Sequence, residues 1–304
     1  MTQTSRNSRG TETAAKPQNI WLLGMRPRTL TMAAVPVVVG AVLAWGGGAN
    51  PEWVTFIVTL ACALLIQIGT NLFNDARDGE RGADGPDRIG PIRITGAGLA
   101  QPKQVRRAAL GCFVTALVAG GYLVVVGGLP ILLVGLASLV SGYAYSAGRR
   151  PLSHGPFGEV FVIAFFGLIA VAGSYYLQSR QLPDAAVVLT GIAVGCYAAG
   201  VLLVNNLRDQ AADLRAGRRT LASRLGTRGT QRLYGFLMLV PFPMLAAAWG
   251  AQSLGLVWLG LPVCLWLAML FARMPVGTAM NAQLGRTALV QVLVGALLIV
   301  EHLS

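Results

Sequence analysis

Long apolar stretches separated by short polar segments dominate the pattern of the chain. Nine such stretches approach the roughly 20 residues that an α-helix needs to cross the hydrocarbon core of a membrane. We therefore predict an all-α fold, a polytopic transmembrane bundle of about nine helices in one domain over residues 20–304, preceded by a polar, disordered cytoplasmic tail over residues 1–19. The predicted spans are Thr29–Trp45, Trp53–Phe73, Ala108–Val126, Leu129–Tyr145, Gly158–Leu177, Ala185–Leu207, Leu233–Trp249, Leu254–Ala272 and Thr287–Leu303.

The distribution of basic residues supports these nine spans. With a cytoplasmic N-terminus, all of the 24 Lys and Arg residues except Arg180 fall in the tail or in cytoplasmic segments. Basic residues mark the cytoplasmic side of membrane proteins. We expect a multi-pass protein of the cell (inner) membrane with its C-terminus outside. The long charged loops after the second and sixth spans predict a functional site that faces the cytoplasm.

Composition removes two other interpretations. The chain is 54% hydrophobic and 12% charged, with a mean hydropathy of +0.61. Its net charge of +12 would suggest nucleic-acid binding in a soluble protein, but here it follows from membrane orientation, so no nucleic acid is expected. The four cysteines lie in apolar runs without CxxC or Cys/His spacing, which argues against disulfides and thiolate metal sites: Cys62, Cys112, Cys196 and Cys264.

Acidic residues are rare and concentrated in two places. Five of the 12 follow the second span, and two occupy the matching position after the sixth. The sequences repeat, because Asn74-Asp75-Ala76-Arg77-Asp78 aligns with Asn205-Asn206-Leu207-Arg208-Asp209. Spacings of three and four residues place each set on one helical face: Asn71, Asn74, Asp75 and Asp78 in the first, and Asn206, Asp209 and Asp213 in the second.

Converging amide and carboxylate oxygens suit a hard cation, and Mg²⁺ is typically held by one or two carboxylates together with substrate phosphate. We predict Mg²⁺ as cofactor, with Asp78, Asp209 and Asp213 as catalytic residues. The alternative is that these carboxylates only pair with arginines at helix ends, which is an open choice for Glu80 and Asp87. The predicted metal ligands are Asn74, Asp78, Asp84, Asn206, Asp209 and Asp213.

Arginines follow both clusters and suggest a diphosphate site, because the guanidinium fork matches phosphate oxygens. Positive-inside topology explains any single arginine equally well, but placement directly after an acidic cluster favours a role in binding. The predicted diphosphate-binding residues are Arg88, Arg149, Arg218 and Arg219.

A third cytoplasmic segment, Tyr143–Leu152, carries aromatic residues that either belong to an interfacial belt or flank a cationic intermediate. We interpret His154 as a loop residue. Glu159, which opens the fifth span, is either a charge at a helix N-terminus or a carboxylate of the site, and the sequence leaves both open.

These segments resemble the UbiA superfamily of membrane prenyltransferases. The match rests on Asn71 to Asp78 with Asp84, and on Asn205 to Asp213 with Gly217-Arg218-Arg219-Thr220. Both motifs occur in order, and the resemblance covers nearly the whole chain beyond the tail. It implies Mg²⁺-dependent transfer of a polyprenyl group from its diphosphate, with the polyprenyl tail lying among the helices in lipid.

Within that superfamily the chain is most similar to 1,4-dihydroxy-2-naphthoate prenyltransferases of menaquinone biosynthesis. Three features resemble that group: the motif Arg26-Pro27-Arg28-Thr29-Leu30, the stretch from Asp84 to Arg93, and the spacing between Asp78 and Asp84. Five residues separate these two aspartates, where 4-hydroxybenzoate enzymes typically have three. One departure is Arg218, where lysine is frequent. The resemblance implies attack by the naphthoate ring with loss of diphosphate, a proton and the carboxylate as CO₂, giving demethylmenaquinone. The expected acceptor-binding residues are Arg28, Arg93, Asn71 and Tyr145.

Two alternatives remain at this stage. One is a prenyltransferase of the same superfamily for another acceptor, such as 4-hydroxybenzoate, homogentisate or a chlorophyll-type alcohol. The other is a secondary transporter, because internal repeats also mark transporters. The polar clusters lie at helix ends and not at mid-span, which disfavours transport.

Overall fold

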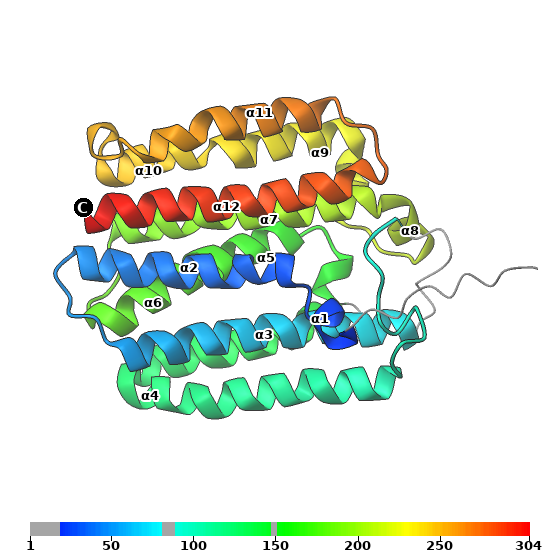
Figure 1. The fold of residues 1–304 in the computed structure, drawn as a ribbon, viewed down its shortest axis with the longest axis horizontal. Coiled ribbons are helices and arrows are strands. Elements are labelled where there is room, and N and C mark those ends of the chain that lie inside the picture. The colour runs from blue at the N-terminus through cyan, green and yellow to red at the C-terminus, as the bar shows by residue number, and fades with distance from the viewer. Residues whose placement is uncertain (1–18, 81–88, 147–150) are drawn as a thin grey trace, which may run out of the picture.

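The computed structural model describes residues 19–80, 89–146 and 151–304. These residues form helices and no β-strand, and Figure 1 shows the longest helices side by side and roughly parallel. The longer elements are α2 (Pro27–Gly46), α3 (Trp53–Glu80), α4 (Pro102–Ser146), α6 (Ala170–Ser179), α7 (Ala185–Arg208), α9 (Leu221–Leu239), α11 (Gly260–Ala272) and α12 (Ala279–Leu303). The shorter ones are α1 (Ile20–Met25), η1 (Leu152–His154), α5 (Gly158–Ile163), η2 (Ala164–Ile169), α8 (Gln210–Arg215), α10 (Pro241–Trp249), η3 (Ala251–Ser253) and η4 (Val257–Leu259).

Seven of the described helices are long and apolar enough to cross a membrane, where the sequence predicted nine spans. The all-α transmembrane class is confirmed, and each predicted segment overlaps a helix. The lower number has two causes. The predicted spans Ala108–Val126 and Leu129–Tyr145 both belong to α4, and Leu254–Ala272 corresponds to a shorter apolar helix, Val257–Ala272.

Helix α4 is a hairpin of two helices that meet at Gly128. This residue has φ 68° and ψ −155°, a backbone conformation that glycine adopts without strain and other residues rarely do. Pro130 follows in the first turn of the second half. The second half returns along the first, since the position of a Cβ on Gly142 would be 3.5 Å from the ring of Phe113. The sequence prediction of two separate spans here therefore describes the backbone well.

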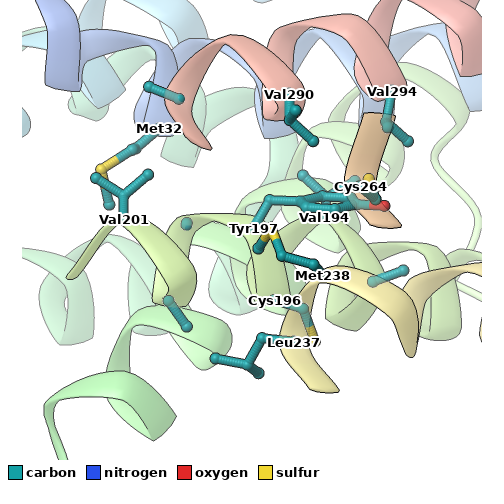
Figure 2. Packing of buried hydrophobic residues seen from close by; sticks show 14 of the residues in the cluster. Met32, Val194, Cys196, Tyr197, Val201, Leu237, Met238, Cys264, Val290 and Val294 are labelled. Atoms are coloured by element: carbon teal, nitrogen blue, oxygen red, sulfur yellow. The ribbon is translucent and has the colours of Figure 1, made fainter. Parts of the chain in front are cut away.

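Helix α7 occupies the centre of the bundle. Figure 2 shows Tyr197 of α7 among Met238 of α9, Cys264 of α11 and Val294 of α12, all of them buried. Lipid tails are as apolar as these side chains, so such packing stabilises the bundle through close van der Waals contact more than through removal of apolar surface from water.

Glycines allow α7 to touch the fifth span backbone to backbone. A Cβ on Gly195 would lie 2.8 Å from the carbonyl oxygen of Ile163, and one on Gly167 would overlap the carbonyl oxygen of Gly191. Any side chain there would force the helices apart. This contact holds α5 and the π-helical turn η2 against α7, whose last turn carries Asn206 of the second polar cluster.

The two ends of the bundle differ in character. Figure 1 shows α1, α8 and the described segment 89–101 toward one end and the C-terminus at the other. Arg180, the exception in the charge pattern, lies at the C-terminal end, where its Nη1 donates to the Val126 carbonyl (2.8 Å) beside the α4 hairpin turn. The predicted tail lies outside the described residues except for Asn19, whose side chain caps α1 by accepting from the amides of Trp21 and Leu22.

Candidate active site

One cavity of about 1210 Å³ brings the two polar clusters together. Asn74 and Asp78 reach it from the end of α3, and Asn206, Asp209 and Asp213 reach it from the end of α7 and from α8. The repeat in the sequence thus corresponds to two walls of a single site at the loop-rich end of the bundle.

The first cluster divides between the cavity and the protein interior. Asp78 lines the cavity and is buried, whereas Asp75, which is 1% exposed, does not line it. The Asp75 carboxylate accepts hydrogen bonds from the backbone amides of Ile94 and Thr95 (both 3.0 Å) and from the Thr95 hydroxyl (2.6 Å). Asp75 therefore anchors the segment after the first motif, and it does not face the cavity together with Asn74 and Asp78 as the shared helical face predicted.

Gly79 explains how that segment approaches α3 so closely. A Cβ at this position would overlap the Thr95 hydroxyl oxygen. The segment that Thr95 anchors also carries Arg93, so a side chain at Gly79 would displace Arg93 from the cavity wall.

Arg218 joins the two clusters. Its guanidinium contacts the Asp78 carboxylate through Nη2, and its Nη1 lies 3.5 Å from Oδ1 of Asp213. Arg93 contacts the other oxygen of Asp78. Asp78 is thus held between an arginine from each motif region, and residues far apart in sequence form one charged network.

The second cluster is organised by Arg208, a residue that the sequence analysis did not assign to the site. It is 2% exposed and binds Asp209 through two parallel hydrogen bonds (2.8 and 2.7 Å). It also donates to the side-chain oxygens of Asn205 (2.7 Å) and of Asn281 on α12 (2.9 Å). The available signal was the repeat itself, because Arg77 occupies the equivalent position in the first motif.

Asn206 faces the cavity from α7 and is tied to the fifth span. Its Nδ2 donates to Oε1 of Glu159 (2.9 Å), which is buried in the first turn of α5. Glu159 does not line the cavity. The sequence left two interpretations of Glu159 open, and its hydrogen bond to Asn206 supports the second, a carboxylate of the site. Glu159 would then act from behind Asn206 and not from the cavity wall.

Positive charge exceeds negative charge around the cavity. Among the described residues its wall contains three aspartates, Asp78, Asp209 and Asp213, and five arginines: Arg26, Arg93, Arg208, Arg215 and Arg218. Burial lowers the pKa of Arg93 to about 9, and repulsion by Arg26 and Arg218 acts in the same direction against the attraction of Asp75 and Asp209. An anion in the cavity would relieve this repulsion.

Several predicted site residues lie elsewhere. Arg219 is exposed and outside the cavity wall, although its backbone amide donates to the His154 carbonyl (2.9 Å). Arg28 is also exposed and lines a separate groove with Arg286, whereas its neighbour Arg26 lines the main cavity. The positions of Arg28 and Arg219 therefore do not support their predicted roles.

Asn71 lines the cavity, as expected of an acceptor-binding residue, but its amide also donates to the Met25 carbonyl (2.9 Å) and the Thr29 hydroxyl (3.1 Å), which ties α3 to the α1–α2 junction. Four predicted site features fall outside what the structure describes: Asp84, Arg88, Arg149 and the side chain of Tyr145.

Beyond the charged residues the cavity continues between α3, the two halves of α4 and the fifth span. Its wall there is apolar and includes Leu123, Ile131, Phe165, Phe166 and Leu177. Four glycines in the same wall have no heavy atom within 4 Å of the position that a Cβ would take, so they leave open space: Gly120, Gly121, Gly135 and Gly173. The cavity is therefore amphipathic and can accept a ligand with a charged head and a long apolar tail.

Comparison with known proteins identifies the family. Residues 33–298 match the model of the UbiA prenyltransferase family. The chain belongs to the UbiA prenyltransferase family. This family membership confirms the resemblance found in the motifs, and it disfavours the alternative that the protein is a secondary transporter.

Curated relatives in the UbiA family include the 1,4-dihydroxy-2-naphthoate octaprenyltransferases of Mycobacterium tuberculosis and Escherichia coli. The first is 38% identical over 72% of this chain and 74% of the relative, and the second is 35% identical over 75% and 76%. A 2-carboxy-1,4-naphthoquinone phytyltransferase of Synechocystis is 28% identical over 73% of this chain and 71% of the relative.

Solved structures confirm the UbiA fold. The structure of a UbiA homologue from Archaeoglobus fulgidus bound to GPP and Mg²⁺ superposes with a TM-score of 0.68 over 94% of this chain and 100% of that one, at 14% identity. A homologue from Aeropyrum pernix superposes with a TM-score of 0.67 over 89% and 97%, at 15% identity. At these identities the likeness concerns the fold alone.

Proposed function

We propose that the protein transfers a polyprenyl group from polyprenyl diphosphate to 1,4-dihydroxy-2-naphthoate, giving demethylmenaquinone in its reduced, quinol form together with diphosphate and CO₂. The observation that carries the proposal is the single amphipathic cavity in which both Asn/Asp clusters meet through Arg218. A diphosphate with an apolar tail matches its charged end and its apolar extension. The acceptor is inferred from the naphthoate octaprenyltransferases that share 33–38% identity with the chain.

The donor diphosphate would lie against the arginines of the charged end. Arg26 and Arg218 both repel the buried Arg93, and phosphate oxygens placed among these arginines would offset that repulsion through charge-assisted hydrogen bonds. As the allylic C–O bond breaks, its electron pair leaves with the diphosphate, whose negative charge these guanidiniums stabilise. The ring of the acceptor supplies the electron pair of the new C–C bond. The carboxylate then leaves as CO₂, and the electron pair of its bond to the ring restores the aromatic 1,4-diol.

The donor atoms of the site suit Mg²⁺. They are carboxylate and amide oxygens, and no group of three His, Cys, Asp or Glu in the described part of the chain is arranged as a metal site. Mg²⁺ commonly takes only one or two carboxylates and completes its shell with water and phosphate. The candidate ligands are Asn74, Asp78, Asn206, Asp209 and Asp213, with Asp84 outside the described residues. Bound Mg²⁺ would act as a Lewis acid on the departing diphosphate.

The site is proposed to face the cytoplasm from a cell (inner) membrane. The basis is the positive-inside pattern of the sequence, because the polar clusters of the cavity belong to the Arg-rich segments that the pattern assigns to the cytoplasm. A hydrophilic aromatic acid would reach the site from that side, and the donor tail would extend into the apolar half of the cavity.

A transfer assay with the purified full-length protein in lipid nanodiscs tests the proposal. Geranyl and longer polyprenyl diphosphates are offered with Mg²⁺ and, in separate reactions, 1,4-dihydroxy-2-naphthoate, 4-hydroxybenzoate or homogentisate. We expect the naphthoate to react fastest, EDTA to abolish transfer and Mg²⁺ to restore it. Faster reaction with another acid would replace the acceptor, and no transfer to any acid would refute the proposal.

A further inference from the structure

Glu159 is a buried acidic residue whose contacts give it no evident packing role. It is 3% exposed, and Oε1 accepts the hydrogen bond from Asn206 Nδ2 (2.9 Å). Its other oxygen, Oε2, is buried without a hydrogen-bond partner in the described structure. Burying a carboxylate with one of its oxygens unsatisfied costs free energy, so Glu159 contributes little stability by itself.

The chemistry of the pair fixes the orientation of the Asn206 amide. An ionised carboxylate can only accept hydrogen bonds, whereas an amide has a donor nitrogen end and an acceptor oxygen end. In the structure the nitrogen end of the Asn206 amide donates to Glu159, which leaves its oxygen end, Oδ1, for the cavity that Asn206 lines. A hard cation such as Mg²⁺ binds the oxygen of an amide and not its nitrogen.

We propose that Glu159 is a positioning residue that holds the Asn206 amide with its oxygen toward the metal. The proposal rests on the proposed function, since it concerns the metal of the same site. Partners behind metal ligands of this kind commonly change metal affinity by about 10–100-fold when they are lost.

The isosteric substitution Glu159→Gln separates positioning from stability. A glutamine can present either its oxygen or its nitrogen to Asn206, so the amide of Asn206 is free to flip and the cavity receives its nitrogen part of the time. A neutral amide is also cheaper to bury than a carboxylate. We expect Glu159→Gln to keep or raise the melting temperature while it weakens metal binding by about 10-fold or more.

The double variant Glu159→Gln, Asn206→Asp restores the interaction with reversed polarity. The introduced glutamine would donate from its amide nitrogen to one oxygen of the introduced carboxylate, whose other oxygen would remain for the cation. In the Asn206→Asp single variant two carboxylates face each other instead. A double-mutant cycle then measures the coupling between the two positions directly.

Binding of Mn²⁺ to the purified full-length protein, followed by electron paramagnetic resonance of the free ion, provides a readout independent of turnover. Mn²⁺ accepts the same oxygen ligands as Mg²⁺. The Mg²⁺ concentration needed for half-maximal prenyl transfer is measured in parallel. Glu301→Gln is the matched control, because Glu301 also accepts a hydrogen bond (from the Leu256 amide, 2.7 Å) but lies at the opposite end of the bundle.

We expect Glu159→Gln to raise the Mn²⁺ dissociation constant and the Mg²⁺ requirement, the double variant to recover most of the loss, and Glu301→Gln to match the wild type. A wild-type Mn²⁺ affinity in Glu159→Gln would overturn the inference, and so would a double variant that binds Mn²⁺ as weakly as Glu159→Gln. Either result would leave the proposed function standing. Failure of the wild-type protein to bind Mn²⁺ or to need a divalent ion would refute the metal site itself.

Discussion

Asp75 and Asp78 lie three residues apart on α3 and have different environments. Asp75 is bound by the backbone of residues 94–95 and holds a loop, whereas Asp78 lies in the cavity between two arginines. Positions 75 and 78 point about 60° apart on a helix, so side chains on one broad face can still reach two different surroundings. The consequences of substitution at each position follow from those surroundings.

Asp78→Asn should lower kcat/KM for prenyl transfer by at least about 10-fold. The substitution removes a charged oxygen ligand and the partner of Arg93 and Arg218, so a modest drop in melting temperature should accompany it. Glu80→Gln is the control on the same helix, because Glu80 pairs with Arg106 at a partly exposed site (2.9 Å) and such pairs contribute little. Steady-state kinetics and thermal unfolding check both variants. Activity close to wild type in Asp78→Asn would remove Asp78 from the metal site.

Arg26 and Arg28 provide a second matched pair. Arg26 lines the main cavity and Arg28 lies outside it. Arg26→Ala should raise the KM for the polyprenyl diphosphate by about 10-fold, the size of a charge-assisted hydrogen bond of about 1.5 kcal/mol, while Arg28→Ala leaves it nearly unchanged. Initial rates at varied donor and saturating acceptor distinguish them. A larger effect at Arg28 would show that the entry motif acts through that residue instead.

At the scale of elements, the site depends on how closely the helices approach. The second cluster lies at the end of α7, and α7 is held against α5 and η2 by glycine contacts at Gly167, Gly191 and Gly195. Glu159 and Asn206 sit on the two elements that this contact joins. A change in the spacing of these helices should therefore disturb the site without altering any residue in it.

Gly195→Ala should lower the melting temperature and the transfer rate together. The new methyl group would lie 2.8 Å from the Ile163 carbonyl oxygen, and overpacking of this kind costs about 1–3 kcal/mol. Gly111→Ala is the control, since Gly111 is exposed on α4 with no heavy atom within 4 Å of the new Cβ. Thermal unfolding in nanodiscs and the transfer assay report both effects. Equal melting temperatures of the two variants would contradict this prediction, because they would mean that α5 and α7 can move apart with no loss of stability.

At the scale of the molecule, the charged residues of the cavity gather at one end of the bundle. The charged residues of the cavity wall come from the ends of α3 and α7 and from α8, and α8 lies at the end of the bundle opposite to the C-terminus (Figure 1). Because the chain enters α2 at the end that carries the cavity's charged residues and leaves α12 at the other, the number of passes from α2 through α12, both included, must be odd. Seven long helices, with α4 counted as its two halves and the short Val257–Ala272 helix as a further pass, satisfy that requirement.

A reporter fused after Ser304 should be active on the side of the membrane opposite to the cytoplasm, and one placed in the loop that contains Arg273 should report the cytoplasm. The reason is the concentration of basic residues at the end where α11 and α12 meet. Paired phosphatase and fluorescent-protein fusions measure both positions. A cytoplasmic C-terminus would contradict the nine-pass topology.

The sequence alone determined the helical spans and the meeting of the two polar clusters at one end. Both follow from local physics, because apolar length sets a membrane crossing and the parity of crossings decides which helix ends share a side. Asn74, Asp78, Asn206, Asp209 and Asp213 were therefore recognisable as one candidate site, and the structure places all five on one cavity.

The tertiary structure decided which neighbours those residues meet. Helical periodicity gives the direction of a side chain but does not say which segment lies opposite. The sequence therefore could not show that Asp75 binds residues 94–95, and it selected Arg28 where Arg26 lines the cavity. The bridge from Arg218 to both clusters and the pairing of Glu159 with Asn206 join distant parts of the chain. Such contacts depend on the spacing of packed helices, which glycines such as Gly195 set in three dimensions.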